Sequence, residues 1–414
     1  MRHRSVVAAL TVCIVAIGAF PAGGQRPTRT PLPVPVGPRP TYPGVYVKEI
    51  PAVPPVIEQA ATSVVAFIGA TPTGPIDTPT MVTSFAEYAA QFGGLDPASP
   101  VSFAVRLFFD NDGTRAWIVR SDLTSTLNLG GGATALTSAL QALDAVEPVN
   151  ILCLPEVGDE VLLATAEGWC SRHRAFLLID PPADAATPAA VEAWLSSPDA
   201  PPRKRDCATY FPWLRVLVGG NSTGLRDCGP CGAVAGVIAR TDAKRGVWKA
   251  PAGTDANLRG VTSLTHTLTN AETAQLNAQG VNSLRTMPAT GTVVWGARTL
   301  SSDPEWRYVP VRRFTLMLEE SIDAGTEWAV FEPNAEPLWL RLHASVDAFM
   351  QELWRKGALQ GVKAEEAYFV QCGLGTTMTA GDVAAGRVIV TVGFAPMRPA
   401  EFVVLTFTKQ TATP

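Results

Sequence analysis

This sequence lacks a large excess of charge of either sign. Its 33 Lys and Arg residues nearly balance its 37 Asp and Glu residues, which gives a formal net charge of −4. A chain so close to balance does not attract nucleic acid or an anionic membrane over long distances. No run of basic residues with interleaved aromatic residues marks a nucleic-acid-binding face either. The composition therefore excludes nucleic acid as an expected partner.

Motifs for catalysis and cofactor binding are missing as well. The sequence has no GxxxxGKS phosphate loop, no GxGxxG after a strand, no HExxH and no EF-hand spacing. The stretch GTTMTAG at 375–381 resembles the surroundings of a subtilase nucleophile, but it has Thr377 in place of serine. None of the four histidines has an HGTH-like context: His3, His173, His266 and His343. We predict no catalytic residue, cofactor, metal or small-molecule substrate, and hence a structural part rather than an enzyme.

Cysteines are few, scattered and odd in number. Three of the seven stand among apolar residues and are expected to be core thiols: Cys153, Cys170 and Cys372. Cys228 and Cys231 form a single CxxC, without the strand-to-helix setting of a redox motif or the second pair of a zinc site. We expect a small loop there, with a surface disulfide to Cys207 as an alternative.

The apolar run at the N-terminus is too short to span a bilayer. It covers residues 5–20, whereas a spanning helix needs about 20 apolar residues. With MRHR before it and AGG at 22–24 after it, the segment 1–25 is typical of a secretory signal. Residues 26–40 contain six prolines and are expected to form an extended linker. The alternative is a start codon assigned too far upstream, with initiation at Val34 or Val36.

Helix and strand patterns alternate through the middle of the chain. Continuous apolar runs predict buried strands at 64–68, 149–155, 175–182 and 210–218, with a further strand at 116–119. Helical spacing predicts helices at 136–143, 160–173 and 189–195, and Ser84 is placed to cap another that holds Phe85, Tyr88 and Phe92. This alternation predicts a parallel or mixed sheet that helices cover on both faces. Asp180 follows one strand where α/β enzymes keep catalytic groups, but a structural role is the stronger expectation in its IDPP turn.

The small residues of GAVAG at 232–236 predict a tight helix, followed by an exposed WKAPAG turn at 248–253. Two amphipathic helices are predicted within 301–359, with a strand at 326–334 between them. The second helix carries an apolar stripe made of Trp339, Leu342, Val346, Phe349 and Leu353. Two long strands are predicted within 386–408.

Two strand-like segments lie near the ends of the chain. Prolines fence TYPGVYVKEI at 41–50, so it is either an edge strand or an arm that adds to a neighbour's sheet. The strand at 401–408 is apolar on both faces and must be internal or must pair with a partner, because a free edge of this kind aggregates.

Several long strings, in order, resemble the contractile tail sheath proteins of myophage tails and related injection systems. The resemblance covers residues 41–408. The strings are PGVYVKEI, TSVVAFIGATPTGP, GAVAGVIARTDAKRGVWKAPAG, VVWGARTLSSDPEWRYVPVRR, WAVFEPNAEPLW, TTMTAGDVAAGR and FAPMRPAEFVV. Residues 199–231 depart from the family, with extra cysteines where relatives have a PPSG-type turn.

The resemblance implies an α/β fold. It comprises a tail-sheath-like central domain at 61–290, with subtilisin-like topology and no triad, and a C-terminal α/β domain at 291–409. An N-terminal arm at 41–60 follows the signal-like segment 1–25 and the linker 26–40. The two arms are implied to join a neighbouring subunit's sheet. Carried over to this sequence, the linking residues are Gly44, Val45, Tyr46, Val47 and Lys48, and Phe402, Val403, Val404 and Leu405 within the strand 401–407.

The implied function is that of a sheath subunit that polymerises into a helical sheath around an inner tube. Contraction of the sheath drives the tube through a target cell envelope. The implied partners are other copies of the chain, the inner tail tube protein, and the baseplate and tail terminator proteins. The family assembles in the cytoplasm, so the signal-like segment conflicts with the resemblance. It leaves open the alternative of an exported α/β hydrolase-like enzyme.

Overall fold

An eight-stranded sheet forms the centre of the molecule. The computed structural model describes residues 10–16, 55–122, 129–146, 148–219 and 222–401. The strand order is β12-β11-β7-β6-β5-β2-β4-β3; the six inner strands run parallel, and the two outer strands pair antiparallel at the edges. The bounds are β2 Val65–Gly69, β3 Thr80–Val82, β4 Ala116–Arg120, β5 Ile151–Cys153, β6 Phe176–Ile179, β7 Cys207–Phe211, β11 Val281–Met287 and β12 Gly291–Trp295. The predicted mixed sheet is confirmed.

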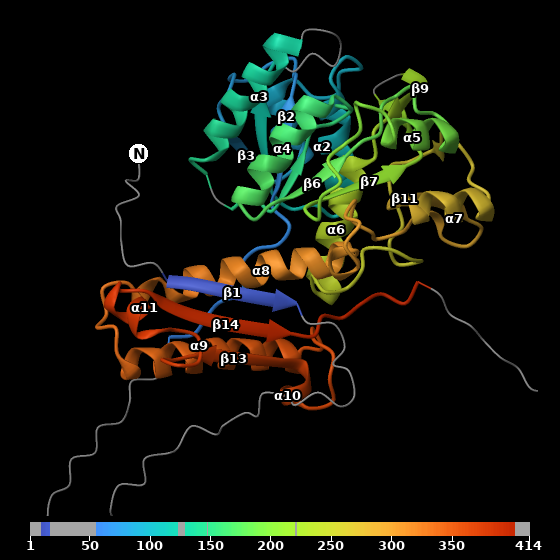
Figure 1. Ribbon diagram of the computed structural model, residues 1–414. Coiled ribbons are helices and arrows are strands. Elements are labelled where there is room, and N and C mark those ends of the chain that lie inside the picture. Colours follow the sequence, from blue (N-terminus) through green and yellow to red (C-terminus); the bar gives the residue numbers. More distant parts are fainter. Residues whose placement is uncertain (1–9, 17–54, 123–128, 147, 220–221, 402–414) are drawn as a thin grey trace, which may run out of the picture.

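Helices cover both faces of this sheet (Figure 1). Val65 and Phe67 of β2 face a core shared with one helix set, whereas Ala66 and Ile68 face the core shared with the other. Burial on both faces explains why the inner strands β2, β5 and β6 are continuous apolar runs. The first set is α1 Phe85–Phe92, α2 Pro100–Asp110 and α6 Cys231–Arg245; the second is α3 Leu129–Leu143, α4 Glu160–Arg172, α5 Pro188–Leu195 and α7 Asn270–Ala278.

The tight helix predicted from small residues is α6, which crosses α2 at very short range. A Cβ atom added at Gly232 would lie 2.2 Å from the carbonyl oxygen of Ala104, and one at Gly236 would lie 2.5 Å from that of Phe108. Both positions therefore require glycine, because the obstructing atoms belong to the backbone of α2. The close approach buries α6 from Cys231 to Arg240.

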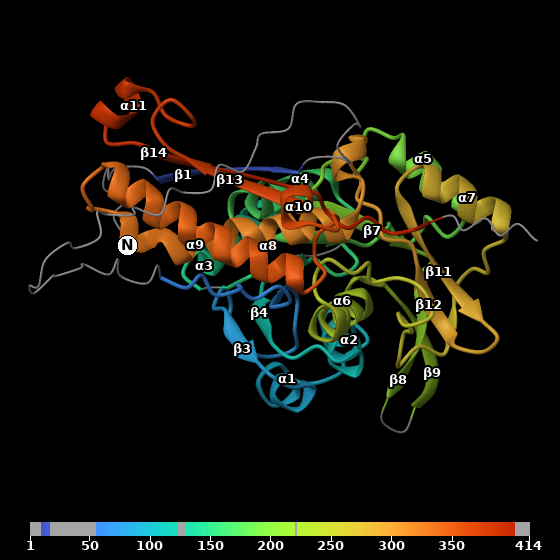
Figure 2. The same cartoon turned by 90° about the horizontal axis from the view of Figure 1, so that it is seen from below.

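The single strand predicted at 210–218 is wrong. Phe211 ends β7 in the large sheet, and a second strand, β8 Leu214–Gly219, begins a separate sheet with β9 Ser222–Cys228 and β10 Ser263–Leu264. The peptide bond before Pro212 is cis, and proline has no N–H group to continue the ladder. The apolar run conceals this break because both halves are strands. Figure 2 shows the β8–β9 hairpin extending from the body of the molecule.

The C-terminal domain consists of two long helices under a small sheet. The predicted helices are α8 Val309–Thr326 and α9 Glu336–Arg355, and all five residues of the predicted apolar stripe on α9 are buried. Strand β13 Tyr368–Cys372 pairs antiparallel with β14 Val388–Phe394. The domain also contains short helices at η1 Pro304–Trp306, η2 Glu327–Ala329, α10 Ala364–Ala367 and α11 Ala380–Ala384. The second strand predicted within 386–408 lies outside the described residues.

The strand predicted at 326–334 is wrong. Thr326 is the last residue of α8, where its hydroxyl group donates to the carbonyl of Ile322 (2.6 Å), and a 3-10 turn, η2 Glu327–Ala329, follows. Trp328 packs under the guanidinium group of Arg341 instead of facing a strand neighbour (4.4 Å to the ring centroid). Phe331 has a left-handed φ of 71° and is 87% exposed. Of the predicted strand, Thr326 belongs to α8, residues 327–329 form η2, and the remaining residues form the connection to α9.

A strand from the far N-terminus completes the C-terminal sheet. Strand β1 Leu10–Ala16 pairs parallel with β14 over its full length, from Leu10 opposite Val388 to Ala16 opposite Phe394. Figure 1 shows β1 and β14 side by side, next to α8. This part of the signal-like segment is thus a β-strand of the folded subunit.

Candidate assembly interface

Helix α8 is fastened to the central domain by a buried ion pair. Arg313 donates from Nη1 to Asp242 Oδ1 (3.0 Å) and from Nη2 to Asp242 Oδ2 (2.7 Å), and also reaches the carbonyl of Thr62 (2.6 Å). The two side chains are 3% and 5% exposed. Asp242 lies near the end of α6, and the hydroxyl of Thr62 donates to its Oδ2 (2.7 Å). The pair is almost completely buried and both carboxylate oxygens accept from the guanidinium group, so it fixes the position of α8 against α6.

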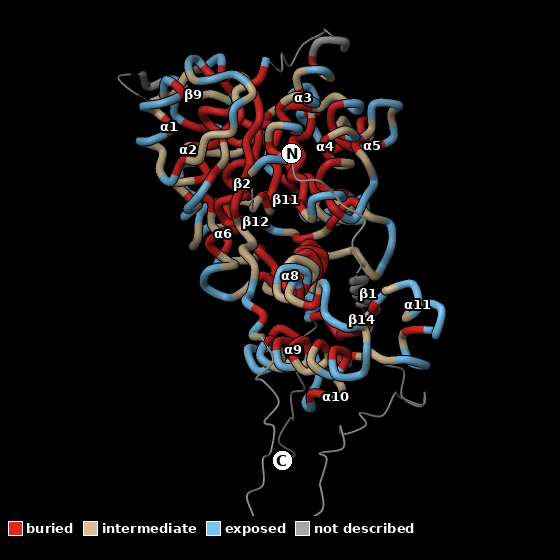
Figure 3. Tube along the Cα trace, turned by 90° about the vertical axis from the view of Figure 1, so that its left-hand side faces the viewer, coloured by how far each residue is buried: buried red, intermediate tan, exposed pale blue. Residues whose placement is uncertain are grey.

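Two further arginines join the same helix to the central domain. Arg312 forms a buried ion pair with Asp206, and its guanidinium group lies over Trp306. Arg174, which follows α4, donates to Glu320 (3.0 Å) and Asp323 (2.8 Å) of α8. Figure 3 shows α8 between the two parts of the molecule, with much of its surface buried. These contacts hold the central and C-terminal domains together as one unit.

The sheet of the C-terminal domain has open edges. Its order is β1-β14-β13, so the outer edges of β1 and β13 have no strand partner within the described part of the chain. The sheet packs on the core that α8 and α9 share, where Val390, Val392 and Phe394 are fully buried. At such an edge, unpaired N–H groups can donate to, and unpaired C=O groups can accept from, a strand of another chain.

The chain leaves the C-terminal domain beside a charged contact. Glu401, the last described residue, receives Arg298 Nε at Oε1 (2.8 Å) and Arg298 Nη2 at Oε2 (2.5 Å). Tyr308 Oη donates to the same Oε2 (3.2 Å). Burial raises the pKa of Glu401, but the hydrogen bonds and charge of Arg298 outweigh it and leave this pKa below its ordinary value. Glu401 is therefore held in place as a carboxylate.

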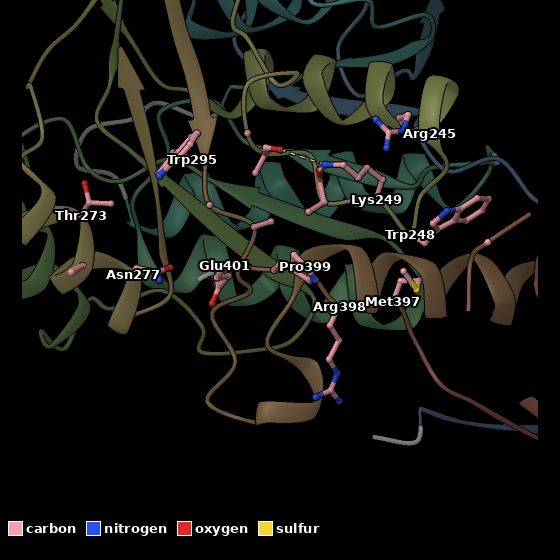
Figure 4. Close-up of a pocket in the computed structure, with 18 of the residues that line it drawn as sticks. Arg245, Trp248, Lys249, Thr273, Asn277, Trp295, Met397, Arg398, Pro399 and Glu401 are labelled. Atoms are coloured by element: carbon pink, nitrogen blue, oxygen red, sulfur yellow. Dashed lines mark hydrogen bonds between the residues drawn. The ribbon is translucent and has the colours of Figure 1, made fainter. Parts of the chain in front are cut away.

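A cavity of about 750 Å³ lies next to this contact, between the end of α6, strand β12 and residues 397–401. Figure 4 shows Trp248 and Lys249 on one side and Met397, Arg398 and Glu401 on the other. The WKAPAG turn, predicted to be exposed, forms part of the wall and is largely covered. Ala250 is buried, and Lys249 folds back so that its Nζ donates to the carbonyl of Ala250 (2.8 Å). The turn is held by packing, which its local sequence does not reveal.

Asp180 has a structural role, as expected. Its Oδ2 accepts from the backbone N–H of Glu156 (3.0 Å), and its Oδ1 accepts from that of Cys231 (2.8 Å), the first residue of α6. The carboxyl group is fully buried. Burial raises its pKa to about 6, although the two N–H bonds lower it. Both oxygens accept hydrogen bonds from backbone N–H groups and the side chain is fully buried, which weakens the hydrolase alternative.

The alternative of a surface disulfide between Cys207 and the CxxC is wrong. Cys207, Cys228 and Cys231 are buried free thiols, because they belong to β7, β9 and α6 in the core of the central domain. The expectation that the CxxC lacks a strand-to-helix setting is also wrong, because Cys228 ends β9 and Cys231 begins α6. Cys153 and Cys170 are buried as predicted, and Cys372 is half-buried. Burial raises the pKa of Cys231 and of Cys228, which keeps both thiols protonated and unreactive.

Thr377 occupies a turn, where its hydroxyl group is bonded to the backbone. Its hydroxyl donates to the carbonyl of Ile389 (2.7 Å) and accepts from the N–H of Gly373 (3.1 Å). In the described ranges, His, Cys, Asp and Glu side chains nowhere gather in threes that could hold a metal ion. A separate finding concerns membranes: among the helices that the structure describes, none is both long and apolar enough to cross one.

The predicted linking residues lie outside the described residues, on both arms: Gly44, Val45, Tyr46, Val47 and Lys48, and Phe402, Val403, Val404 and Leu405. Their predicted roles stay predictions. What sequence reasoning missed is the contact between Arg298 and Glu401. The sequence signal for this contact is weak: Arg298 and Glu401 are charged residues within two family strings, VVWGARTL and FAPMRPAEFVV. Nothing in the two strings indicates that they come together in the fold.

Two family descriptions match consecutive parts of the chain. "Phage tail sheath protein central domain" matches residues 131–300, and "Phage tail sheath C-terminal domain" matches residues 301–410. A Pseudomonas aeruginosa (strain UCBPP-PA14) protein described as a prophage major tail sheath protein is 26% identical over 230 residues. That match covers 54% of this chain and 50% of the relative, so it spans only about half the length of the curated relative.

Solved structures match over nearly the whole chain. The helical sheath of the anti-feeding prophage in its contracted state is 33% identical with a TM-score of 0.72, covering 90% of this chain and 100% of that one. The PVC sheath complex of an extracellular contractile injection system, also contracted, is 30% identical with a TM-score of 0.71, covering 90% and 99%. A sheath tail protein from Listeria innocua has a TM-score of 0.55 at 10% identity over 82% of this chain and 96% of its own, which shows a shared fold alone.

Proposed function

Since this chain belongs to the contractile tail sheath family, we propose that it is a sheath subunit, which polymerises into a helical sheath around an inner tube and contracts to drive that tube through a target cell envelope. The whole-chain likeness to subunits of contracted sheaths carries this proposal. The buried arginine contacts of α8 support it further. A subunit whose two domains are fastened together can change its place in the lattice as a rigid body.

The subunits are linked through their arms. Residues Gly44–Lys48 form the donated N-terminal arm, and the strand that contains Phe402–Leu405 is the C-terminal arm. The open edges of the sheet β1-β14-β13 support this assignment, because they offer unpaired backbone groups to an incoming strand. Strand links survive a rearrangement of the rigid bodies around them, so neighbouring subunits stay connected during contraction.

The partners of the subunit are other copies of itself, the baseplate, the inner tube protein and a tail terminator protein. Relatives in a helical sheath and in a baseplate support the first two. The subunit assembles into its particle in the cytoplasm and has no catalytic activity. The committed oxygens of Asp180 and the turn geometry of Thr377 support the absence of catalysis.

The domain boundary lies near residue 300 rather than at 290. Strands β11 and β12 form one antiparallel hairpin, from Ser283 opposite Trp295 to Met287 opposite Gly291, within the central sheet. A boundary between 290 and 291 would divide this hairpin. The junction between the two matched families, at residues 300 and 301, supports the later position.

Electron microscopy tests the proposal. The full chain and the chain from Gly37 onward are each co-expressed with the tube protein encoded beside them, and the particles are imaged in negative stain. Striated hollow sheaths are the expected result from the full chain. The chain from Gly37 onward lacks β1, so its result shows whether assembly needs that strand. Monodisperse globules from both chains, in the presence of assembled tubes, contradict the proposed function. Deleting residues 1–51 should give soluble subunits without sheaths, and ordered sheaths from this deletion would contradict the N-terminal arm.

A further inference from the structure

The four residues before Glu401 are only weakly attached to the rest of the protein. The last backbone contacts of the C-terminal domain are those of Ala395, which donates to Ala367 and accepts from Gln360, and a bridge between Pro396 and Leu359. In the described chain, none of residues 397–400 makes a hydrogen bond to another residue. Met397, Arg398 and Ala400 are exposed. The polypeptide after Pro396 is therefore a tether until Glu401 meets Arg298.

The guanidinium group that receives Glu401 is fixed before the glutamate arrives. The fully buried side chain of Asn282 on β11 accepts the backbone N–H of Arg298 (2.6 Å) and donates to its carbonyl (2.7 Å). Arg298 Nη1 also donates to the carbonyl of Asn277 at the end of α7 (2.9 Å). These bonds come from the central domain and none involves the C-terminal tether. Arg298 thus presents a rigid, oriented fork to a carboxylate.

We propose that Arg298 is a positioning residue that anchors the C-terminal arm: by binding Glu401, with help from Tyr308, it fixes the point and direction at which the arm leaves the subunit. This inference rests on the proposed function, in which the residues after Glu401 join a neighbour's sheet. The contact is 14% exposed at Arg298 and 17% exposed at Glu401, so water screens it only partly. The anchor belongs to the central domain, although the arm follows the C-terminal domain in sequence.

The anchor acts by restricting the start of the arm. Without it, the arm would begin at Pro396, and five flexible residues have a root-mean-square span of about 12 Å. A flexible start lets the arm occupy many positions, which lowers its effective concentration at the neighbour's sheet edge. With the anchor in place, a pull on the arm is transmitted to β11 and α7 through Arg298.

The test compares four forms of the full chain, each co-expressed with its tube protein: the wild type, Glu401→Gln, Glu352→Gln and a chain that ends at Glu401. The critical concentration for sheath assembly is measured by sedimentation, and the Tm is measured on the soluble subunit. Glu352→Gln is the matched control, because it removes the same charge from an exposed ion pair with Lys356 in the same domain. We expect Glu401→Gln to raise the critical concentration about tenfold, which is about 1.4 kcal/mol. The Tm should match that of the control.

Methyl NMR of 13C-labelled methionine gives a second readout on the soluble subunit. Met397 lies in the tether, whereas Met350 is fully buried in α9. In Glu401→Gln the Met397 signal should sharpen, because the tether is released, and the Met350 signal should not change. A role in stability alone would lower the Tm without altering either the Met397 linewidth or the critical concentration.

Each outcome has one meaning. If the chain ending at Glu401 does not assemble and Glu401→Gln assembles like the wild type, the anchor is wrong and arm donation stands. If the chain ending at Glu401 assembles like the wild type, the C-terminal arm of the proposed function is wrong, and the anchor with it. A lowered Tm for Glu401→Gln with unchanged assembly also overturns the anchor.

Discussion

The central eight-stranded sheet and the sheet of the C-terminal domain differ in where their strands come from. All eight strands of the central sheet lie between Val65 and Trp295, and helices of the same region bury both faces. The C-terminal sheet takes β13 and β14 from the end of the chain and β1 from its beginning, and within the described residues it still has two open edges. The first sheet is complete within its own domain, and the second depends on a remote strand. Under the proposed function, the incomplete sheet is the one that receives strands from neighbouring subunits.

The largest expected effect comes from separating the two regions at α8. Arg313→Met removes one partner of a buried pair and leaves Asp242 without its countercharge, which should cost about 3 to 5 kcal/mol. Denaturant unfolding should then show the two domains melting in separate steps. Adding Asp242→Asn should recover part of the loss, since no charge is then left unpaired. A loss below about 1 kcal/mol for Arg313→Met would mean that this pair does not join the domains.

A somewhat smaller effect is expected inside the closed domain. Gly232→Ala places a methyl group 2.2 Å from the carbonyl oxygen of Ala104 and should cost about 3 kcal/mol, although alanine favours helices. Gly168→Ala on α4 is the matched control, because the nearest atom to its new methyl group is 3.7 Å away. The control should be neutral or stabilising by up to about 1 kcal/mol. Equal stability of the two variants, measured by denaturant unfolding, would refute the close crossing.

The buried carboxyl group predicts a pH dependence that belongs to the central domain. The pKa of Asp180 is raised to about 6 from 3.8, so the folded state binds the proton more tightly than the unfolded state does. Protonation of Asp180 therefore stabilises the fold as the pH falls through 6 toward 4, and this contribution is lost at higher pH. As the pH falls through that window, the free energy of unfolding of the wild type should rise relative to that of Asp180→Asn, by up to about 1.4 kcal/mol per pH unit. No change in this difference between pH 7 and pH 4 would contradict the assignment.

The smallest expected effect comes from removing the same kind of N-terminal helix cap in the central domain and in the C-terminal domain. Thr269 caps α7 and Thr379 caps α11, each in a capping box with the carboxylate three residues later, Glu272 and Asp382. Thr269→Ala should lower global stability by about 1 kcal/mol, because Leu276 ties α7 to the core. Helix α11 has no buried residue, so Thr379→Ala should only speed hydrogen exchange at 380–385. A global shift as large as that of Thr269→Ala would show that α11 is not peripheral.

The central domain could be predicted well because its signals are local. The inner strands β2, β5 and β6 are continuous apolar runs, α4 and α5 lie where helical spacing predicts them, and Ser84 caps α1 by accepting the N–H of Glu87 (3.2 Å), as expected. Strand β11 and helix α7 are not predicted, because their sequences, VNSLRTM and NAETAQLNA, have no such pattern. The errors fall where tertiary structure decides the outcome. Pro212 divides one apolar run between two sheets, and packing against the C-terminal segment covers the WKAPAG turn.

The candidate interface could be predicted only in part. The motifs predict where the two arms lie, and that stays a prediction. The contact between Arg298 and Glu401 joins residues 103 positions apart, and no local sequence pattern indicates such a contact. The pairing of β1 with β14 is missed for the same reason. The composition of residues 10–16 is equally suitable for a signal segment and for a sheet strand, and only the partner decides between them.

The pairing of Leu10 with Val388 sets an order of events during synthesis. At about 5 to 20 residues per second, the ribosome adds β14 roughly 20 to 75 s after β1 has been made. The central domain has all its strands well before that time and can fold while translation continues. The sequence LTVCIVA of β1 must wait through the whole interval without its partner, as a short apolar β-prone segment open to aggregation. A nascent sheath subunit is thus most in need of a chaperone at its first residues and for as long as its last domain is unmade.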